Sequence, residues 1–260
     1  MKPHGHPVTH FTFSSLTDEH VPHLTTTRHC PGVTPSHLVS GPFNDGAAAL
    51  LESAGLDYSR LAWARQVHGN AVARVGANGG RFADGVDVLV TDKPGVGLAI
   101  FTADCLALTL VDQEAGAIAV AHAGWRGTAR DVPGVAVNAL RELGGRTERV
   151  RATIAPSIGP CCYEVDEPVT RELGAALPDL WQRWVTPARP GHVMLDLWAA
   201  NEDLLVRAGV DRARIENPRM CTACHRDLLY SYRKGDRGRL VTVAALPSRA
   251  AWPVSPRSAC

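Results

Sequence analysis

The stretch GLAIFTADCLALTLVDQEAGAIAVAHAGWRG, from Gly97 to Gly127, decides the fold class. It holds three short apolar runs, GLAIFTADC, LALTLVD and AIAVAHAG, which are bounded by glycine and aspartate. Apolar runs of this length between Gly, Asp and Pro favour buried strands over helices. The stretch therefore predicts three consecutive buried strands, each followed by a polar loop.

Similar patterns continue on both sides of this stretch. Short apolar runs predict further strands in LAWARQVH, AVARV, DVLVTD, RVRATIAPSIG and RLVTVAAL. Helical spacing predicts helices over Ala129–Leu143, Asp166–Leu177 and Leu195–Ala208, and a short one over Ala47–Ala54 that ends at Gly55. No Pro/Gly/Ser-rich boundary separates these elements, so we predict an α/β fold, a single mixed α/β domain over residues 1–260. Within it, residues 1–23 and 247–260 are expected to be irregular, with short strands among the first ~45 residues.

The composition excludes several classes of protein. With 45% apolar and 20% charged residues and a formal net charge of +1, the chain has no global electrostatic bias toward nucleic acid or a membrane surface. No run approaches the roughly 18 apolar residues of a membrane helix. The N-terminus MKPHGHPVTHFTF lacks the basic and apolar regions of a signal peptide. We therefore expect a cytoplasmic protein, a monomer, without nucleic-acid or membrane partners.

The seven cysteines are odd in number. In a reducing compartment they are more consistent with core residues, metal ligands or reactive thiols than with a disulfide framework. They lie at Cys30, Cys105, Cys161, Cys162, Cys221, Cys224 and Cys260.

Three polar side chains stand where predicted strands end: His68, Cys105 and His122. Strand ends are where α/β folds commonly assemble sites, because the sheet fixes positions while the loops stay accessible. Two imidazoles and a thiolate, with a fourth position left to water, are the ligand set of a catalytic zinc. The alternative from the residues alone is a buried cysteine and two histidines bonded to backbone carbonyls.

The neighbours of this trio suit a polar or anionic substrate. Arg126, beside Trp125 and between glycines, presents a guanidinium for a phosphate or carboxylate. The alternative is an ion pair of Arg126 with Asp104 or Asp131, with Trp125 in the core. Asp104 either orients a ligand histidine or caps a turn.

The segment CTACH, Cys221–His225, matches the attachment pattern of c-type haem. Because haem attachment normally belongs to exported proteins, we expect no haem and a mainly structural role for Cys221 and Cys224. A structural zinc would need a second ligand pair, for which Cys161 and Cys162 are available. A basic cluster follows that is typical of a solvated turn: Arg233, Lys234, Arg237 and Arg239.

Five motifs in order carry a resemblance to a known family. They are QVHG (Gln66–Gly69), TADC (Thr102–Cys105), AHAGWRGT (Ala121–Thr128), IGPCCYEV (Ile158–Val165) and CTACHRDLLYSYRKGDRGR (Cys221–Arg239). Over about Leu24–Leu246 the chain resembles the laccase-domain family, also called multicopper polyphenol oxidase-like. Its members are described as purine nucleoside phosphorylases with adenosine deaminase activity.

The resemblance implies a mixed α/β sandwich with a metal site at strand ends, and a zinc ion held by His68, Cys105 and His122. It also implies roles for several residues around the metal. Arg28 and Asn44 correspond to substrate-side positions, although HCPGVTPSHLVSGPFND between them departs from the family pattern. Gln66, Trp125 and Arg126 complete the expected substrate and phosphate site, and Asp104 is the candidate general acid.

Three functions follow as hypotheses. The first is a zinc-dependent phosphorylase of purine nucleosides (adenosine, inosine, guanosine or methylthioadenosine) that also deaminates adenosine. The second is a copper phenol oxidase, since Cys and His also suit copper. It ranks lower because six of the 11 histidines lie in the first 29 residues and the rest are scattered. The third is a non-catalytic or hydrolytic factor in peptidoglycan editing, to which some relatives are linked.

Overall fold

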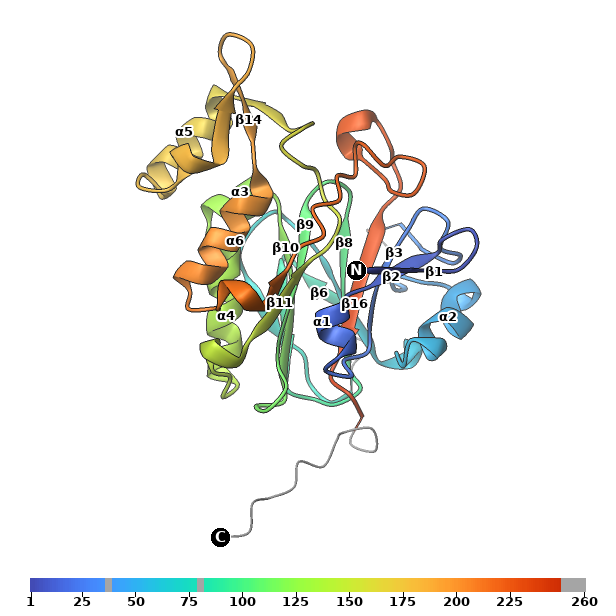
Figure 1. Cartoon of the computed structure of the whole chain (residues 1–260). Coiled ribbons are helices and arrows are strands. Elements are labelled where there is room, and N and C mark those ends of the chain that lie inside the picture. The colour runs from blue at the N-terminus through green and yellow to red at the C-terminus, as the bar shows by residue number, and fades with distance from the viewer. Residues whose placement is uncertain (36–38, 79–81, 249–260) are drawn as a thin grey trace.

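The apolar runs pair into two sheets that face each other (Figure 1). The structure, a computed structural model, describes residues 1–35, 39–78 and 82–248. The first sheet contains, in spatial order, β1 (Lys2–His4), β2 (His10–Thr12), β3 (His23–Thr26), β16 (Leu240–Ala245), β8 (Gly97–Thr102), β4 (Leu61–Arg65) and β6 (Phe82–Asp84). The second contains β15 (Ile215–Glu216), β11 (Arg151–Ile154), β9 (Leu106–Asp112), β10 (Ala117–Ala123), β7 (Val88–Thr91) and β5 (Val72–Arg74). A third, smaller sheet has the order β12 (Glu164–Asp166), β14 (His192–Leu195) and β13 (Val185–Pro187).

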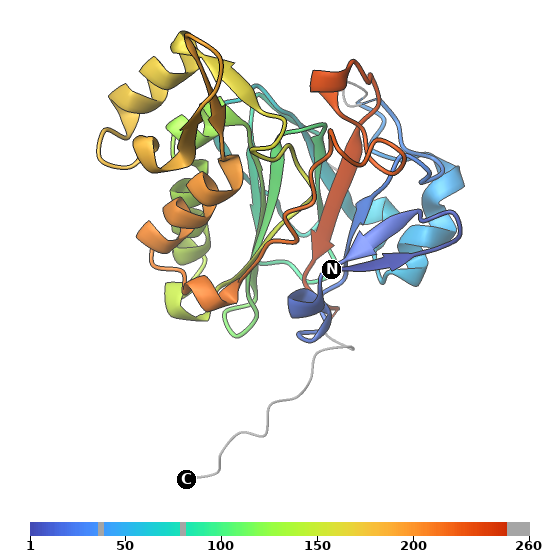
Figure 2. The ribbon, with the colours of Figure 1, turned by 45° about the horizontal axis from the view of Figure 1, so that its top comes forward.

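Helices cover the outer faces of the two large sheets. The α-helices are α1 (Ser14–Thr17), α2 (Ala48–Ser53), α3 (Trp125–Ala129), α4 (Val132–Glu142), α5 (Glu167–Ala176) and α6 (Leu197–Arg207). Short 3-10 helices span Asp45–Ala47, Tyr58–Arg60, Thr147–Arg149, Trp181–Trp184, Arg212–Arg214 and Tyr232–Lys234. Figures 1 and 2 show α3, α4, α5 and α6 beside the second sheet and α2 on the far side of the first. The predicted mixed α/β sandwich is confirmed.

Alternation along the central strands produces three separate apolar layers. On β10, Ile118 and Val120 face the first sheet, whereas Ala119 and Ala121 face the helices. On β8, Leu98 faces the second sheet. Both faces of these strands are thus buried, which explains why they read as continuous apolar runs rather than alternating ones. The layers follow the order helices, sheet, sheet, helix.

The metal trio lies at one end of this sandwich. The chain crosses from the first sheet to the second between β8 and β9, and again between β4 and β5. Because β4 runs parallel to β8, both crossings occur at the same end. The last residues of β10 pair with the first of β9, Ala123 with Leu106, so β10 ends there as well. Residues 68, 105 and 122 are thereby brought to one edge.

Most predicted strands and helices are confirmed, but some elements differ from the prediction. The helix expected over Ala129–Leu143 is α4, which begins only at Val132 because Pro133 has no amide hydrogen and is tolerated only in the first turn of a helix. The short helix α3 before it was not predicted. Asp131 begins α4 from a left-handed conformation, φ 54°, and accepts a hydrogen bond from the Gly134 amide. Residues 1–23, expected to be irregular with short strands, contain the short strands β1 and β2 and, in addition, the helix α1. The prediction for the C-terminal tail falls largely on residues 249–260, outside the described residues.

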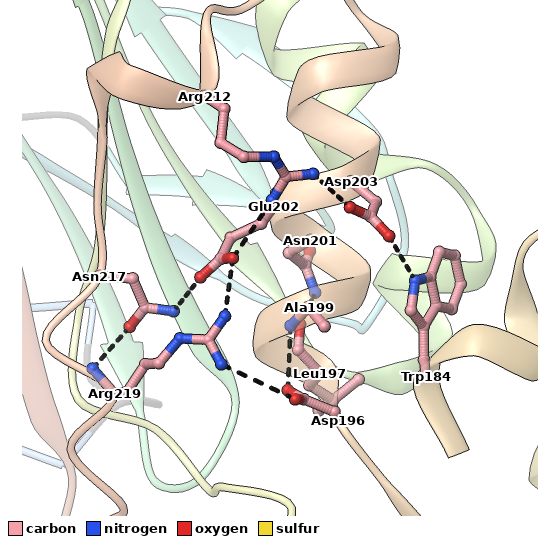
Figure 3. Close-up of polar contacts among 10 residues, drawn as sticks. All are labelled: Trp184, Asp196, Leu197, Ala199, Asn201, Glu202, Asp203, Arg212, Asn217 and Arg219. Carbon is pink, nitrogen blue, oxygen red and sulfur yellow. Dashed lines mark hydrogen bonds and ion pairs between the residues drawn. The ribbon is translucent and has the colours of Figure 1, made fainter.

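A polar network fastens the chain before Cys221 to α6 (Figure 3). The Glu202 carboxylate accepts hydrogen bonds from Asn217 Nδ2 at 2.7 Å and from Arg219 Nη2 at 2.8 Å. Arg212 joins Glu202 to Asp203. Glu202 is only 9% exposed, so its charge requires these partners. The network fixes the path by which residues 217–220 approach the metal end of the sandwich.

No helix within the described residues is long and apolar enough to cross a bilayer.

Acid is expected to destabilise this fold through His23. Burial lowers the pKa of His23 below its usual 6.5, and its Nε2 accepts a hydrogen bond from the Phe13 amide at 2.7 Å. Burial and two neighbouring histidines lower the pKa of His10 to about 4. Stability supplied by these neutral side chains is present above pH 6.5 and lost as the pH falls toward 4.

Urea unfolding at a series of pH values measures this loss, which amounts to about 1.4 kcal/mol per pH unit for each extra proton bound by the unfolded chain. His23→Gln should flatten the slope, whereas His20→Asn, at an exposed position, should not. An unchanged slope in His23→Gln would contradict the assignment.

Candidate metal centre

His68, Cys105 and His122 converge, as predicted from their positions at strand ends. Their ligand atoms all lie within 4.8 Å of one another, and the two imidazole rings meet edge to face with centroids 4.8 Å apart. The set consists of two nitrogens and one sulfur, which is a ligand set for a divalent transition metal. The exposed His68 and the buried His122 place the group at the boundary between core and solvent.

Two backbone features allow this convergence. His68 adopts a left-handed conformation, φ 59°, which the carboxylate of Asp87 stabilises by accepting hydrogen bonds from the amides of residues 67, 68 and 69. Gly124 follows β10, and a Cβ atom there would lie 2.8 Å from Cys105 Sγ. Only glycine permits this approach, which explains the small residues around His122 in AHAGWRG.

Asp87 also orients the His122 ring. Its Oδ1 lies 2.8 Å from Nδ1 of His122, and its carboxylate is fully buried. With Nδ1 bonded to a carboxylate, Nε2 is the nitrogen left for a metal ion, as in many carboxylate–histidine–zinc arrangements. Sequence reasoning missed Asp87. Its only signal was an aspartate directly before the strand VLVT, which does not distinguish a ligand partner from a turn residue.

The electrostatics of the trio favour a thiolate on Cys105 beside a protonated imidazole on His122. Burial opposes ionisation of Cys105, but the charges and hydrogen bonds of His122 and His68 outweigh it and lower the thiol pKa to about 6. Burial likewise disfavours a charged His122, yet Cys105 and Asp87 raise its pKa to about 9. Cys105 is therefore a thiolate at neutral pH, and His122 would have to lose its proton to act as a metal ligand.

Asp104 does not contact either histidine ligand, which corrects the expectation that it orients one. Its Oδ1 accepts a hydrogen bond from Thr222 Oγ1 at 2.6 Å, and its Oδ2 accepts one from the Arg233 amide at 2.7 Å. Its backbone has φ 85°, so the side chain turns away from that of the adjacent Cys105. Asp104 instead ties the turn that carries Cys105 to the segment after Cys221.

A pocket of about 520 Å³ opens on the trio. This volume is in the range of small-molecule sites. Arg126 lines it and is exposed, with its guanidinium 4.2 Å from the Trp125 ring centroid. Within the described residues Arg126 forms no ion pair, since Asp131 pairs with Arg207 and both carboxylate oxygens of Asp104 are bonded elsewhere. The alternative of an Arg126 ion pair with either aspartate is therefore wrong.

The other residues expected to contact substrate, Gln66, Trp125 and Asn44, differ in whether they line this pocket. Gln66 lines the pocket, but both ends of its amide bind the Phe101 backbone, at 2.6 and 3.0 Å, so it continues the pairing of β4 with β8. Trp125 supports Arg126 from a neighbouring hollow. Asn44 caps a 3-10 helix through the Gly46 amide and does not line the pocket.

Arg28 lies in an adjacent cavity of about 320 Å³. It pairs with Asp236 at 3.1 Å and stacks on Tyr230 at 4.8 Å. Arg239 lines both cavities, although its position in a basic cluster suggested only a solvated turn. The unusual segment between Arg28 and Asn44 includes residues 36–38, which lie outside the described residues.

A known protein family matches this chain over most of its length. Residues 44–247 match the family model described as multi-copper polyphenol oxidoreductase laccase. The chain belongs to this family. The laccase-family resemblance of the five motifs is thus confirmed over most of the chain.

Individual relatives carry names of nucleoside enzymes. A "purine nucleoside phosphorylase" of Deinococcus radiodurans is 42% identical over 204 residues, which cover 78% of this chain and 75% of the relative. "Adenosine deaminase RL5", from an unknown prokaryotic organism, is 34% identical over 73% of this chain and 76% of its own. The crystal structure of the hypothetical protein YfiH of Bacillus licheniformis superposes with a TM-score of 0.81 at 26% identity, covering 92% of this chain and 96% of that one.

Proposed function

We propose that this protein is a zinc-dependent enzyme that cleaves purine nucleosides with phosphate and deaminates adenosine. The observation that carries the proposal is the His68–Cys105–His122 set at the base of an open pocket with an unpaired guanidinium beside it. The names of the phosphorylase and deaminase relatives supply the substrate class.

The three side chains fit a catalytic zinc ion. Three protein ligands leave one coordination position open to the pocket, whereas structural zinc is closed by four. His122 Nε2, His68 and the Cys105 thiolate would hold the ion, and Asp87 fixes the His122 ring. When bound, zinc supplies Lewis acidity that makes water a nucleophile at neutral pH.

The pocket residues account for binding of the remaining groups. Arg126 and Arg239 present positive charge for phosphate, because guanidinium groups bind phosphate oxygens in paired hydrogen bonds. Tyr232 lines the same pocket and is 71% exposed, which leaves its ring free to stack on a purine. The same pocket thus offers contacts for the base and for the anion.

The two reactions differ in the bond that breaks. In deamination, water adds to the purine carbon that bears the amino group, and ammonia leaves to give inosine. In phosphorolysis, the bond between base and sugar breaks, and phosphate held by Arg126 joins the sugar carbon to give ribose 1-phosphate. Only the second reaction needs the anion, so the two depend differently on Arg126.

A copper-dependent phenol oxidase is the second candidate, favoured by the description of the family model. Copper(II) binds nitrogen and sulfur ligands more tightly than zinc does. A multicopper enzyme needs several histidine-rich sites, however. Within residues 1–35, 39–78 and 82–248, histidines join a group of three or more metal-binding side chains only in the trio. Zinc chemistry on nucleosides is therefore the proposal.

The test is to incubate the purified protein with adenosine, inosine, guanosine and methylthioadenosine, with and without phosphate, and to identify the products. We expect free base and ribose 1-phosphate (or its methylthio analogue) only with phosphate, and inosine from adenosine without it. Oxygen uptake with a phenol, measured on copper-loaded protein, tests the second candidate. Absence of both nucleoside reactions from zinc-loaded protein would refute the proposal.

Arg126→Ala is expected to impair phosphorolysis more than deamination. A charge-assisted contact to phosphate is worth about 1.5–3 kcal/mol, which corresponds to a roughly 10- to 150-fold higher phosphate requirement. Steady-state rates at varied phosphate measure the effect, and the melting temperature reports the fold. Arg141→Ala, at an exposed position on α4, is the matched control. Equal loss of both activities with a lowered melting temperature would assign Arg126 to the scaffold instead.

A further inference from the structure

Four cysteines from two distant segments meet outside the trio. Cys161 and Cys162 lie in the turn after β11, and Cys221 and Cys224 lie in the CTACH turn after the α6 network. Their sulfur atoms all lie within 4.8 Å of one another. Cys224 Sγ is 3.6 Å from Cys161 Sγ and 3.5 Å from Cys162 Sγ.

These separations suit a single metal ion. Zinc–sulfur bonds of about 2.3 Å in a tetrahedron place the sulfurs about 3.8 Å apart. The distances at Cys224 are within a few tenths of an ångström of that value. Four thiolates around one centre select zinc or iron among the common metals. Two irons bridged by sulfide would hold the thiolates in two separate pairs, so the single group favours one ion.

Core packing does not explain the group. Cysteines that act as small apolar residues are buried, as Cys30 is. Here Cys161 and Cys224 are exposed, and Cys162 is only partly buried. Cys221 is buried, but the other three cysteines gain little from apolar burial, so burial does not explain why the four sulfurs lie together.

The backbone holds the two turns together without the sulfurs. The Ser157 amide donates to the Met220 carbonyl at 3.2 Å, and the Thr222 amide donates to the Ser157 carbonyl at 3.1 Å. The Gly159 amide donates to Cys221 Sγ at 3.3 Å, a contact that stabilises a thiolate. The Glu202 network fixes the chain before Cys221 (Figure 3). The ligand set is therefore preorganised.

We propose that Cys161, Cys162, Cys221 and Cys224 bind one zinc ion in a closed tetrathiolate site, separate from the His68–Cys105–His122 centre. Four protein ligands leave no position for substrate, so this ion acts structurally. It joins the turn after β11 to the CTACH turn. Thr222 in that turn binds Asp104, next to Cys105, so the ion steadies one wall of the metal pocket. The site also occupies the sulfurs that haem attachment would need.

Metal analysis of the intact chain tests the proposal. Protein purified without added metal, then loaded with zinc and desalted, should carry about two zinc ions per chain. The double variant Cys161→Ser/Cys224→Ser should carry one fewer than wild type, and so should His68→Ala. Combining the three substitutions should remove both ions. Cys30→Ala, which removes a thiol elsewhere, should leave the count unchanged. The double variant should also melt at a lower temperature.

Cobalt substitution in the wild-type protein gives an independent readout if the double variant fails to fold. A tetrathiolate cobalt site produces intense sulfur-to-metal charge transfer and strong visible bands, which should appear in the wild type and be kept in His68→Ala; absence of these bands from both proteins would contradict the tetrathiolate site. A wild-type count of one ion that His68→Ala abolishes would overturn the proposal. Iron at the site would overturn the assignment to zinc. A disulfide from Cys224 to Cys161 or Cys162, detected as a mass two hydrogens lower in unreduced protein, would overturn the metal site itself.

Discussion

Cys105→Ser is expected to remove the metal ion of the trio and to abolish both nucleoside reactions. The thiol pKa of about 6 makes Cys105 a thiolate at neutral pH, whereas a serine hydroxyl stays protonated and binds zinc poorly. Removing a residue that hydrogen-bonds to a metal ligand costs about 10–100-fold in metal affinity or activity. Loss of the ligand itself should therefore cost more than 100-fold. Both activities should fall together, because both depend on the same ion.

The measurement combines product formation from adenosine, with and without phosphate, and the metal content of the purified variant. Cys30→Ser is the matched control, since Cys30 is a cysteine outside both metal groups. Retention of metal and activity by folded Cys105→Ser would contradict the proposed centre. Complementation of a strain that lacks this protein with the Cys105→Ala variant distinguishes catalysis from a binding role in peptidoglycan editing. A non-catalytic binding protein would still complement after loss of the Cys105 thiol.

Asp87→Asn should weaken metal binding by about 10–100-fold while leaving the ligands in place. The carboxylate orients His122 at 2.8 Å and accepts three backbone amides of the loop that carries His68. An asparagine amide has one acceptor oxygen rather than two, so at least one of these buried donors loses its partner. We therefore expect a second effect, a loss of about 1–3 kcal/mol in the free energy of unfolding.

Zinc titration against a competing chelator measures the affinity, and urea unfolding of the metal-free protein measures the stability. Activity should recover in part at high zinc concentration, which separates an orienting role from a direct catalytic one. Asp84→Asn is the control, because Asp84 forms an exposed ion pair with Arg65 and such pairs contribute little. Unchanged affinity in Asp87→Asn would show that the Asp87–His122 contact does not orient the ligand.

Local patterns determined much of the fold. The apolar runs between Gly97 and Gly127 fixed β8, β9 and β10, since a strand buried on both faces needs an unbroken apolar sequence. The small sheet of β12, β13 and β14 was not predicted, because its strands are short and partly exposed and so lack a clear period. The start of α4 at Val132 follows from Pro133, whose effect is local, but the helical spacing around it extended the predicted helix back to Ala129.

At the candidate site, too, the sequence identified local motifs but not the contacts between side chains that are distant in the chain. The ordered motifs identified His68, Cys105 and His122, because a motif conserves residue type and chain order together. They did not show which carboxylate serves His122. Adjacency in sequence suggested Asp104, yet its carboxylate accepts a hydrogen bond from Thr222, and Asp87 reaches His122 from the position directly before β7.

The sequence by itself determined the positions of most strands and helices, the family and the three side chains of the candidate metal centre. Tertiary structure alone decided that Asp87 contacts His122, that Arg126 forms no ion pair within the described residues and that four cysteines meet. Cys162 and Cys221 are far apart in the chain, and their meeting depends on the pairing of Ser157 with Cys221 and on the α6 network. Local propensity acts over a few residues, whereas these contacts form only when separate elements pack together. No local sequence pattern encodes which distant side chain a given side chain will then face.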